Sequence, residues 1–143
     1  MNEHKWEDIH LGMKASFDAS FTDEMMLQFA EISGDTNPLH MDADFARAQG
    51  FPGPVVFGLM TSSLYSRLVG LYLPGKYALL QGLDIDFNQP CFPGQVLHVE
   101  GEVSYMNEAF HRFEIRARIR NSEQHTISKA KIRAGVQKIG NHG

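Results

Sequence analysis

The segment Val56-Phe-Gly-Leu-Met-Thr-Ser-Ser-Leu-Tyr-Ser-Arg-Leu-Val-Gly-Leu71 contains a single charged residue, Arg67. It is apolar on nearly every face of the helix that it would form, and such a helix is buried. Small residues recur along it and would let strands pack closely, at Gly58, Thr61, Ser62, Ser63, Ser66 and Gly70. Phe51-Pro-Gly-Pro54 is a rigid turn before the segment, and Tyr72-Leu-Pro-Gly-Lys76 ends it. We therefore predict a long buried helix from Val56 to Leu71.

Alternation of apolar and polar residues predicts four strands after this helix. The alternating stretches run over Leu83 to Phe87, Leu97 to Tyr105, His111 to Ile119 and Ala130 to Val136. Turn residues predict consecutive antiparallel hairpins at Pro90 to Gly94, Asn107 to Ala109 and Asn121 to Gln124. The apolar inner face of such a sheet must be covered, and the buried helix is the only candidate. The predicted fold class is therefore α+β, a single antiparallel sheet wrapped around a long central helix.

Shorter elements are predicted before the central helix. Met13 to Ala19 alternates as a half-buried strand. Thr22 is placed to cap a helix that Gly34 stops, and Asp42 is placed to cap a short helix that ends at Gly50. With no repeat or linker, residues 1–143 are expected to form one domain.

Composition bounds the function classes. The 143 residues are 43% hydrophobic, which suits one globular core, and the net charge of −4 without a basic stripe argues against a nucleic-acid partner. The single cysteine, Cys91, fits a reducing compartment. Met1 to Asp8 does not have the pattern of a signal peptide, and polar residues interrupt the longest apolar run. A cytoplasmic protein without membrane contact is expected. Six further histidines, His142 among them, show no metal-ligand spacing and are read as surface or strand-face residues.

An acid, an amide and an imidazole lie close together in Ser33-Gly-Asp-Thr-Asn-Pro-Leu-His40. We expect Gly34 and Pro38 to keep this segment from being helical, so that Asp35, Asn37 and His40 can turn toward one point for proton transfer. Taken singly, each has an ordinary explanation. Asp35 would form an Asx-turn, Asn37-Pro38 is common in turns, and a lone histidine is more often a surface or core residue than a catalyst.

A family resemblance joins this cluster to the buried helix. The run Phe29-Ala-Glu-Ile-Ser-Gly-Asp-Thr-Asn-Pro-Leu-His40, followed by Phe51, Pro54, Val55, Val56, Gly58, Leu59 and Met60, resembles the (R)-specific enoyl-CoA hydratases, or MaoC-like dehydratases, which have the hot-dog fold. It extends through Leu73-Pro-Gly-Lys76 and Phe87-Asn-Gln-Pro90. It implies that Asp35 and His40 hold a water as an acid–base pair, that Asn37 helps to fix it, and that the backbone N–H of Gly58 donates to the thioester oxygen.

The resemblance also implies where substrate binds. Val56, Phe57 and Ser66 are the expected substrate-binding residues, Ser66 in the acyl pocket. The family usually has His immediately before the donor glycine, and Phe57 stands there instead, which would reshape the pocket. A homodimer or dimer of dimers is implied, with a pantetheine tunnel at the subunit boundary. No metal or separate cofactor is expected, because CoA or carrier-protein pantetheine is part of the substrate.

The predicted function is reversible water addition to a 2-enoyl thioester, that is, an (R)-specific hydratase or 3-hydroxyacyl-thioester dehydratase. Such chemistry needs a base, an acid and a preorganised donor for the enolate oxygen. A hot-dog thioesterase would need a carboxylate near the helix, and no Asp or Glu occurs between Asp44 and Asp84. A dehydratase of the fatty-acid-synthesis type would want His where Gly50 stands. A catalytically silent module that binds acyl thioesters is the remaining alternative, and Phe57 is the feature that favours it.

Overall fold

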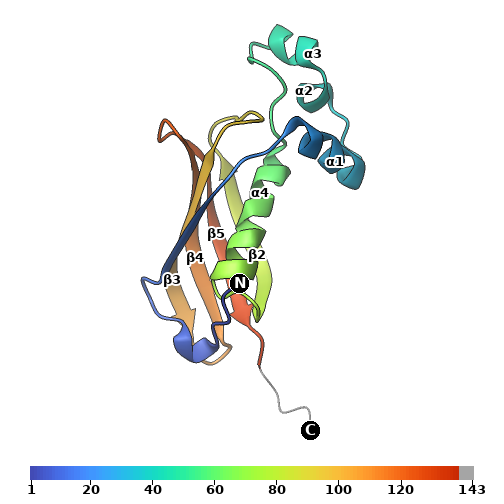
Figure 1. The fold of residues 1–143 in the computed structure, drawn as a ribbon. Coiled ribbons are helices and arrows are strands. Elements are labelled where there is room, and N and C mark those ends of the chain that lie inside the picture. Colours follow the sequence, from blue (N-terminus) through green and yellow to red (C-terminus); the bar gives the residue numbers. More distant parts are fainter. Residues whose placement is uncertain (139–143) are drawn as a thin grey trace.

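A computed structural model describes residues 1–138, so His142 and the end of the predicted domain lie outside the described residues. The predicted hot-dog architecture is confirmed: α4 (Gly58–Arg67) lies across one face of an antiparallel sheet (Figure 1). The strands are β1 (Lys14–Ala19), β2 (Ala78–Phe87), β3 (Leu97–Asn107), β4 (Arg112–Asn121) and β5 (Thr126–Val136). Their order in the sheet is β1-β3-β4-β5-β2.

The hairpin predicted at Pro90 to Gly94 is wrong. β2 pairs with β5, whereas β3 pairs with β1 and β4, so the connection crosses from one edge of the sheet toward the other. Its backbone groups bond to other segments instead: the Val56 N–H donates to the Cys91 carbonyl at 2.9 Å, and the Gly94 N–H donates to the Phe21 carbonyl at 2.8 Å. Turn residues mark where a strand ends, but they do not specify the edge that the next strand joins. The hairpins between β3 and β4 and between β4 and β5 are confirmed.

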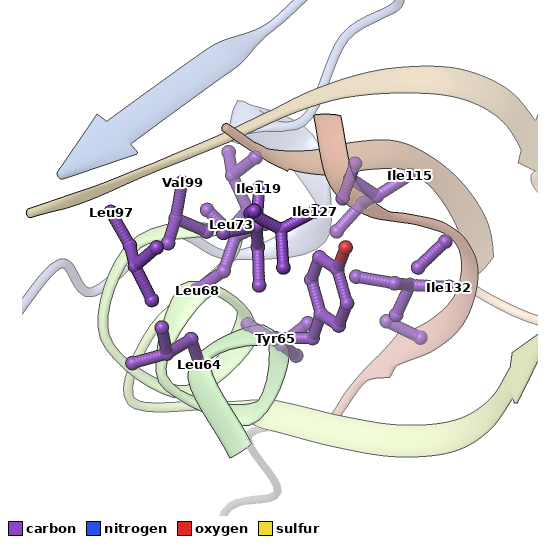
Figure 2. Close-up of a cluster of buried hydrophobic side chains, with 14 of the residues drawn as sticks. Leu64, Tyr65, Leu68, Leu73, Leu97, Val99, Ile115, Ile119, Ile127 and Ile132 are labelled. Atoms are coloured by element: carbon purple, nitrogen blue, oxygen red, sulfur yellow. The ribbon is translucent and has the colours of Figure 1, made fainter. Parts of the chain in front are cut away.

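The central helix is shorter at its start than predicted. Val56 and Phe57 precede it, and α4 begins at Gly58 and continues into a π-helical turn, η2 (Leu68–Tyr72). Figure 2 shows how Leu64, Tyr65 and Leu68 of this segment meet the apolar side chains of the sheet, among them Val99, Ile115, Ile119 and Ile132. The Tyr65 hydroxyl shares a hydrogen bond of 2.6 Å with the Ser128 hydroxyl, which satisfies both buried groups.

Close approach of helix and sheet depends on a strand glycine as well as on the small helix residues. A Cβ on Gly101 of β3 would lie 2.7 Å from Leu68 Cδ2 and 2.9 Å from Ile115 Cγ2. Thr61 and Ser62 are buried as expected, but Ser63 and Ser66 are exposed. The small residues therefore do not all serve helix–sheet packing.

Three short helices gather beyond the N-terminal end of α4, at the top of Figure 1. α1 (Asp23–Ser33) is capped by Thr22, whose hydroxyl accepts from the Met25 N–H, and stops at Gly34 with a φ of +74°. α3 (Ala43–Ala48) is capped by Asp42, as predicted. Between them lies α2 (Pro38–Met41), so the expectation that Pro38 keeps this segment from being helical is wrong. Proline at the first helical position supplies a helical φ, and its missing N–H would have no intrahelical partner there.

Within residues 1–138, no helix is long and apolar enough to cross a membrane.

Candidate active site

Asp35 and Asn37 build the turn that starts α2. One Asp35 carboxylate oxygen accepts from the Asn37 N–H at 3.0 Å, and the Asn37 side-chain oxygen accepts from the Leu39 N–H at 2.9 Å. The Asp35 N–H donates to the Ser33 hydroxyl at 3.1 Å. The Asx-turn that was the ordinary explanation for Asp35 is therefore present. It engages one carboxylate oxygen, Oδ1, of an exposed side chain, and so it holds Asp35 in place beside α2.

His40 is tethered to the chain that leads into α4. Its Nδ1 lies 2.7 Å from the Val55 carbonyl oxygen, and the Val55 N–H donates to the Leu39 carbonyl at 3.1 Å. A carbonyl oxygen can only accept, so Nδ1 carries the proton in this bond. In the neutral imidazole, Nε2 is then the nitrogen with a free lone pair. The half-buried ring therefore keeps a proton acceptor available on its other side.

Phe57 lies under the His40 ring. The two ring centroids are 4.2 Å apart with an interplanar angle of 25°, and the Phe57 side chain is only 2% exposed. Phe29 of α1 also packs against Phe57, with its ring centroid 4.8 Å from that of Phe57 at an angle of 52°. α1, α2 and the start of α4 thus meet through three rings. Sequence reasoning missed Phe29 as part of this site, although it begins the motif run.

Gly58 is the first residue of α4, with Phe57 as the N-cap. The amide N–H at this position has no intrahelical carbonyl to bond, and the helix dipole favours negative charge beside it. The Thr61 and Ser62 hydroxyls both donate to the Gly58 carbonyl, at 2.6 and 2.9 Å, which ties down the first turn. This end of the helix can therefore hold an N–H donor in a fixed direction for a ligand oxygen.

Phe87, at the end of β2, covers one side of Gly58. A Cβ on Gly58 would lie 3.0 Å from Phe87 Cε1 and 3.1 Å from Cζ, so the phenyl ring comes close to the glycine Cα only because no side chain is there. The Phe87 side chain is 55% exposed. In the sequence Phe87 is the last apolar position of a strand and begins the Phe87-Asn-Gln-Pro90 part of the family resemblance, but neither reading linked it to Gly58.

The structure thus brings the predicted groups of the loop and the helix start to one end of α4 and leaves Ser66 apart. Val56 and Phe57 are buried, at 3% and 2% exposure. Ser66 is exposed and lies near the other end of α4, roughly 12 Å from Gly58 along the helix axis.

Within residues 1–138, neither the single thiol nor a metal-ligand cluster offers a competing site. Burial raises the pKa of the Cys91 thiol to about 11, so the thiol stays protonated near neutral pH. No group of three or more His, Cys, Asp or Glu side chains could hold a metal ion in the described part of the chain. A concavity of about 920 Å³ lies on the sheet and is lined by both basic and acidic side chains, among them Arg116, Lys131, Asp86 and Glu100; none of the predicted site residues lines it.

Comparison with known proteins gives consistent matches. The family model described as MaoC like domain matches residues 8–125. An (R)-specific enoyl-CoA hydratase of Aeromonas caviae is 36% identical over 102 residues, which cover 71% of this chain and 76% of that protein. A 3-hydroxybutyryl-CoA dehydratase of Methylorubrum extorquens is 31% identical over 99 residues, 69% of this chain and 63% of that protein.

Solved structures agree with the fold. The (R)-hydratase from A. caviae involved in PHA biosynthesis superimposes with a TM-score of 0.87 at 30% identity, covering 91% of this chain and 98% of the other. An R-hydratase from Pseudomonas aeruginosa in its unliganded form also gives a TM-score of 0.87, at 26% identity, covering 93% and 85% of the two chains.

Proposed function

Because this chain belongs to the MaoC-like domain family, we propose that it adds water reversibly to 2-enoyl thioesters to give (R)-3-hydroxyacyl thioesters. The relatives named above are, by their names, an enoyl-CoA hydratase and a hydroxyacyl-CoA dehydratase. The observation that carries the proposal is the tether of His40 Nδ1 to the Val55 carbonyl, which leaves Nε2 of the neutral imidazole free at the same end of α4 as the Gly58 N–H.

The reaction needs three groups, and this end of α4 has candidates for each. Asp35 and His40 each offer an acceptor atom, so that one water molecule can donate a hydrogen bond to each of them. As the water oxygen bonds to the β-carbon, one water proton passes to this pair. Charge moves onto the thioester oxygen, where the Gly58 N–H and the helix dipole stabilise the enolate. The pair then supplies a proton to the α-carbon, so the sum is one added water. Asn37 keeps the turn and α2 in position for these steps.

Loss of the conjugated enoyl-thioester absorbance with crotonyl-CoA tests the proposal, and chiral analysis of the product tests its configuration. Asp35→Asn should reduce kcat by about 10²–10⁴-fold, as expected for removal of an acid–base group. Asp44→Asn is the matched control, because Asp44 is a fully exposed carboxylate on neighbouring α3. A wild-type protein without activity on short and medium acyl chains, on both CoA and carrier protein, would contradict the proposal.

The alternative is a module that binds acyl thioesters without turning them over. Phe57 favours it, because a phenyl ring can neither donate nor accept a hydrogen bond where the family usually has imidazole. Calorimetric binding of an acyl-CoA combined with no turnover by the wild type would support this alternative. Turnover that disappears in Asp35→Asn would exclude it.

A homodimer through β2 is part of the proposal. β2 is at an edge of the sheet, and it exposes Leu79 at 44%, Leu80 at 44% and Phe87 at 55%. Leu59 of α4 is 69% exposed as well. Unpaired strand groups beside apolar side chains favour strand pairing with a second copy. Because Phe87 touches Gly58, such an interface would reach the oxyanion donor, where a pantetheine arm could enter.

Light scattering after gel filtration tests the dimer. The wild type should have twice the 16.1 kDa mass of the chain. Leu80→Glu should give a monomer, whereas Leu11→Glu, at a side chain 63% exposed outside β2, should not. A monomeric wild type at micromolar concentration would contradict this part of the proposal. A reducing cytoplasm remains the proposed location, and the single thiol of Cys91 is compatible with it.

A further inference from the structure

Two contacts fix the His40 ring in different directions. The Nδ1 bond to Val55 acts in the plane of the imidazole, but it still permits rotation about the line from Nδ1 to the carbonyl oxygen. The phenyl face of Phe57, stacked at 4.2 Å and 25°, acts perpendicular to that plane and opposes this rotation. Together the two contacts determine the plane of the imidazole and the direction of the Nε2 lone pair.

Phe57 is itself held rigidly. Its side chain is 2% exposed and also packs against the Phe29 ring. Its carbonyl accepts from the Thr61 N–H at 3.0 Å in the first turn of α4. The next residue is Gly58, the proposed oxyanion donor. Phe57 therefore links the orientation of the His40 imidazole to the orientation of the Gly58 N–H.

From these contacts we infer that Phe57 is a positioning residue that acts on the substrate through His40 rather than by direct contact. This inference rests on the proposed hydratase function. Because the ring is buried, its loss should change how well Nε2 is aimed at the bound water and leave binding of the thioester unchanged. A phenyl ring also makes no hydrogen bond that would compete for either imidazole nitrogen. Phe57, the residue before the glycine, thus keeps a function in this chain: its flat ring supports the imidazole without a hydrogen bond.

Phe57→Leu tests the inference, because leucine keeps an apolar side chain but lacks a flat face. Phe113→Leu is the matched control: Phe113 is 1% exposed in β4, so it loses comparable packing without touching His40. Displacement of a catalytic group by about 1 Å can cost on the order of 100-fold. We expect kcat on crotonyl-CoA to fall about 10- to 100-fold in Phe57→Leu with KM within about twofold. Phe113→Leu should retain kcat per folded molecule.

Nitrogen NMR of the imidazole gives a readout that does not depend on activity. The wild type should show His40 as a single sharp Nδ1–H tautomer, as should Phe113→Leu. Phe57→Leu should keep the Nδ1–H tautomer, which the Val55 carbonyl selects, but its Nε2 signal should be broadened by motion of the ring. If Phe57→Leu does not fold, Phe57→Met is the substitute, because it conserves the volume more closely. A raised KM with unchanged kcat, or an unchanged kcat together with an unchanged width of the Nε2 signal, would overturn the inference. Inactive wild type with the expected NMR contrast would contradict the hydratase proposal and leave the positioning contact intact.

Discussion

The contact between Gly58 and Phe87 predicts that adding one methyl group will impair catalysis without unfolding the protein. In Gly58→Ala the new Cβ would lie 3.0, 3.1 and 3.3 Å from three atoms of the Phe87 ring. Carbon atoms pack best at about 3.5–4.0 Å, so the ring or the helix start must move by roughly 0.5–1 Å. Because the Phe87 side chain is 55% exposed, its ring can move enough for the protein to fold. The rest of the contact strain shifts the start of α4, and with it the backbone N–H at position 58.

The expected changes in stability and in kcat follow from three free-energy contributions. Replacing Gly by Ala in a compatible conformation stabilises a protein by about 0.4–1 kcal/mol, which offsets part of the contact strain. The free energy of unfolding should therefore stay within about 1 kcal/mol of the wild type. An oxyanion donor is worth about 2.7–4 kcal/mol, so its misplacement by a fraction of an ångström should cost part of that. We expect kcat to fall about 10- to 100-fold.

A double-mutant cycle with Phe87→Ala is the decisive assay. Phe87→Ala removes the ring that the new methyl group would meet, so Gly58→Ala in that background should lower kcat by less than about threefold. The coupling between the two positions should then be about 1–2 kcal/mol. Urea unfolding of all four proteins controls for stability. An equal loss of kcat in both backgrounds, or wild-type kcat in Gly58→Ala, would refute the reasoning.

Three further predictions concern stability. Asn37→Ala removes the cap of α2 and should lower the free energy of unfolding by about 0.5–2 kcal/mol; an unchanged urea midpoint would contradict this. Burial raises the pKa of Tyr65 from 10.0 to about 12, so the folded protein binds more protons than the unfolded chain in this range, and stability should fall from pH 10 to pH 12. The free energy of unfolding of Tyr65→Phe, measured by urea unfolding over the same pH range, should fall less steeply; an equal slope would contradict this assignment. Lys129 lies directly opposite Arg118 on β4 and directly opposite Asp86 on β2, so Lys129→Glu relieves one like-charge pair and creates another. The urea midpoint should therefore change little at either low or high salt, and a change of more than about 1 kcal/mol in the free energy of unfolding would contradict this balance.

The elements of this fold were predictable because their signals are local. The apolar segment around Tyr65 and the alternating residues of β3 to β5 each indicate which side chains are buried. That local pattern of burial is enough to predict a helix or a strand. Strand order is a different kind of information. The connection near Cys91 contains turn residues as a hairpin does, yet its backbone bonds to Val56 and to Phe21. Those partners are distant in the sequence, so no local pattern could reveal them.

Proline shows the same limit at short range. Pro38 was read as a residue that prevents helix formation, which holds for the interior of a helix. Here Asn37 caps the turn and places Pro38 at the first helical position, where proline fits. The correct interpretation required the cap and the proline to be considered together. The consequence reaches the candidate site, because α2 carries His40 to the Val55 carbonyl.

The departure at Phe57 could be noticed in the sequence but not interpreted there. A residue beside a donor glycine is naturally assigned to the pocket wall, because its neighbour in the chain touches the substrate. Whether its side chain follows its backbone into the pocket depends on what packs over it. Here the His40 ring of α2 stacks on Phe57 and Phe29 of α1 packs against it, so the phenyl ring supports the imidazole that we propose as the base. A change from imidazole to phenyl is costly where the ring must donate a hydrogen bond. It costs little where the ring must only present a flat surface, and the contacts of Phe57 are of this second kind.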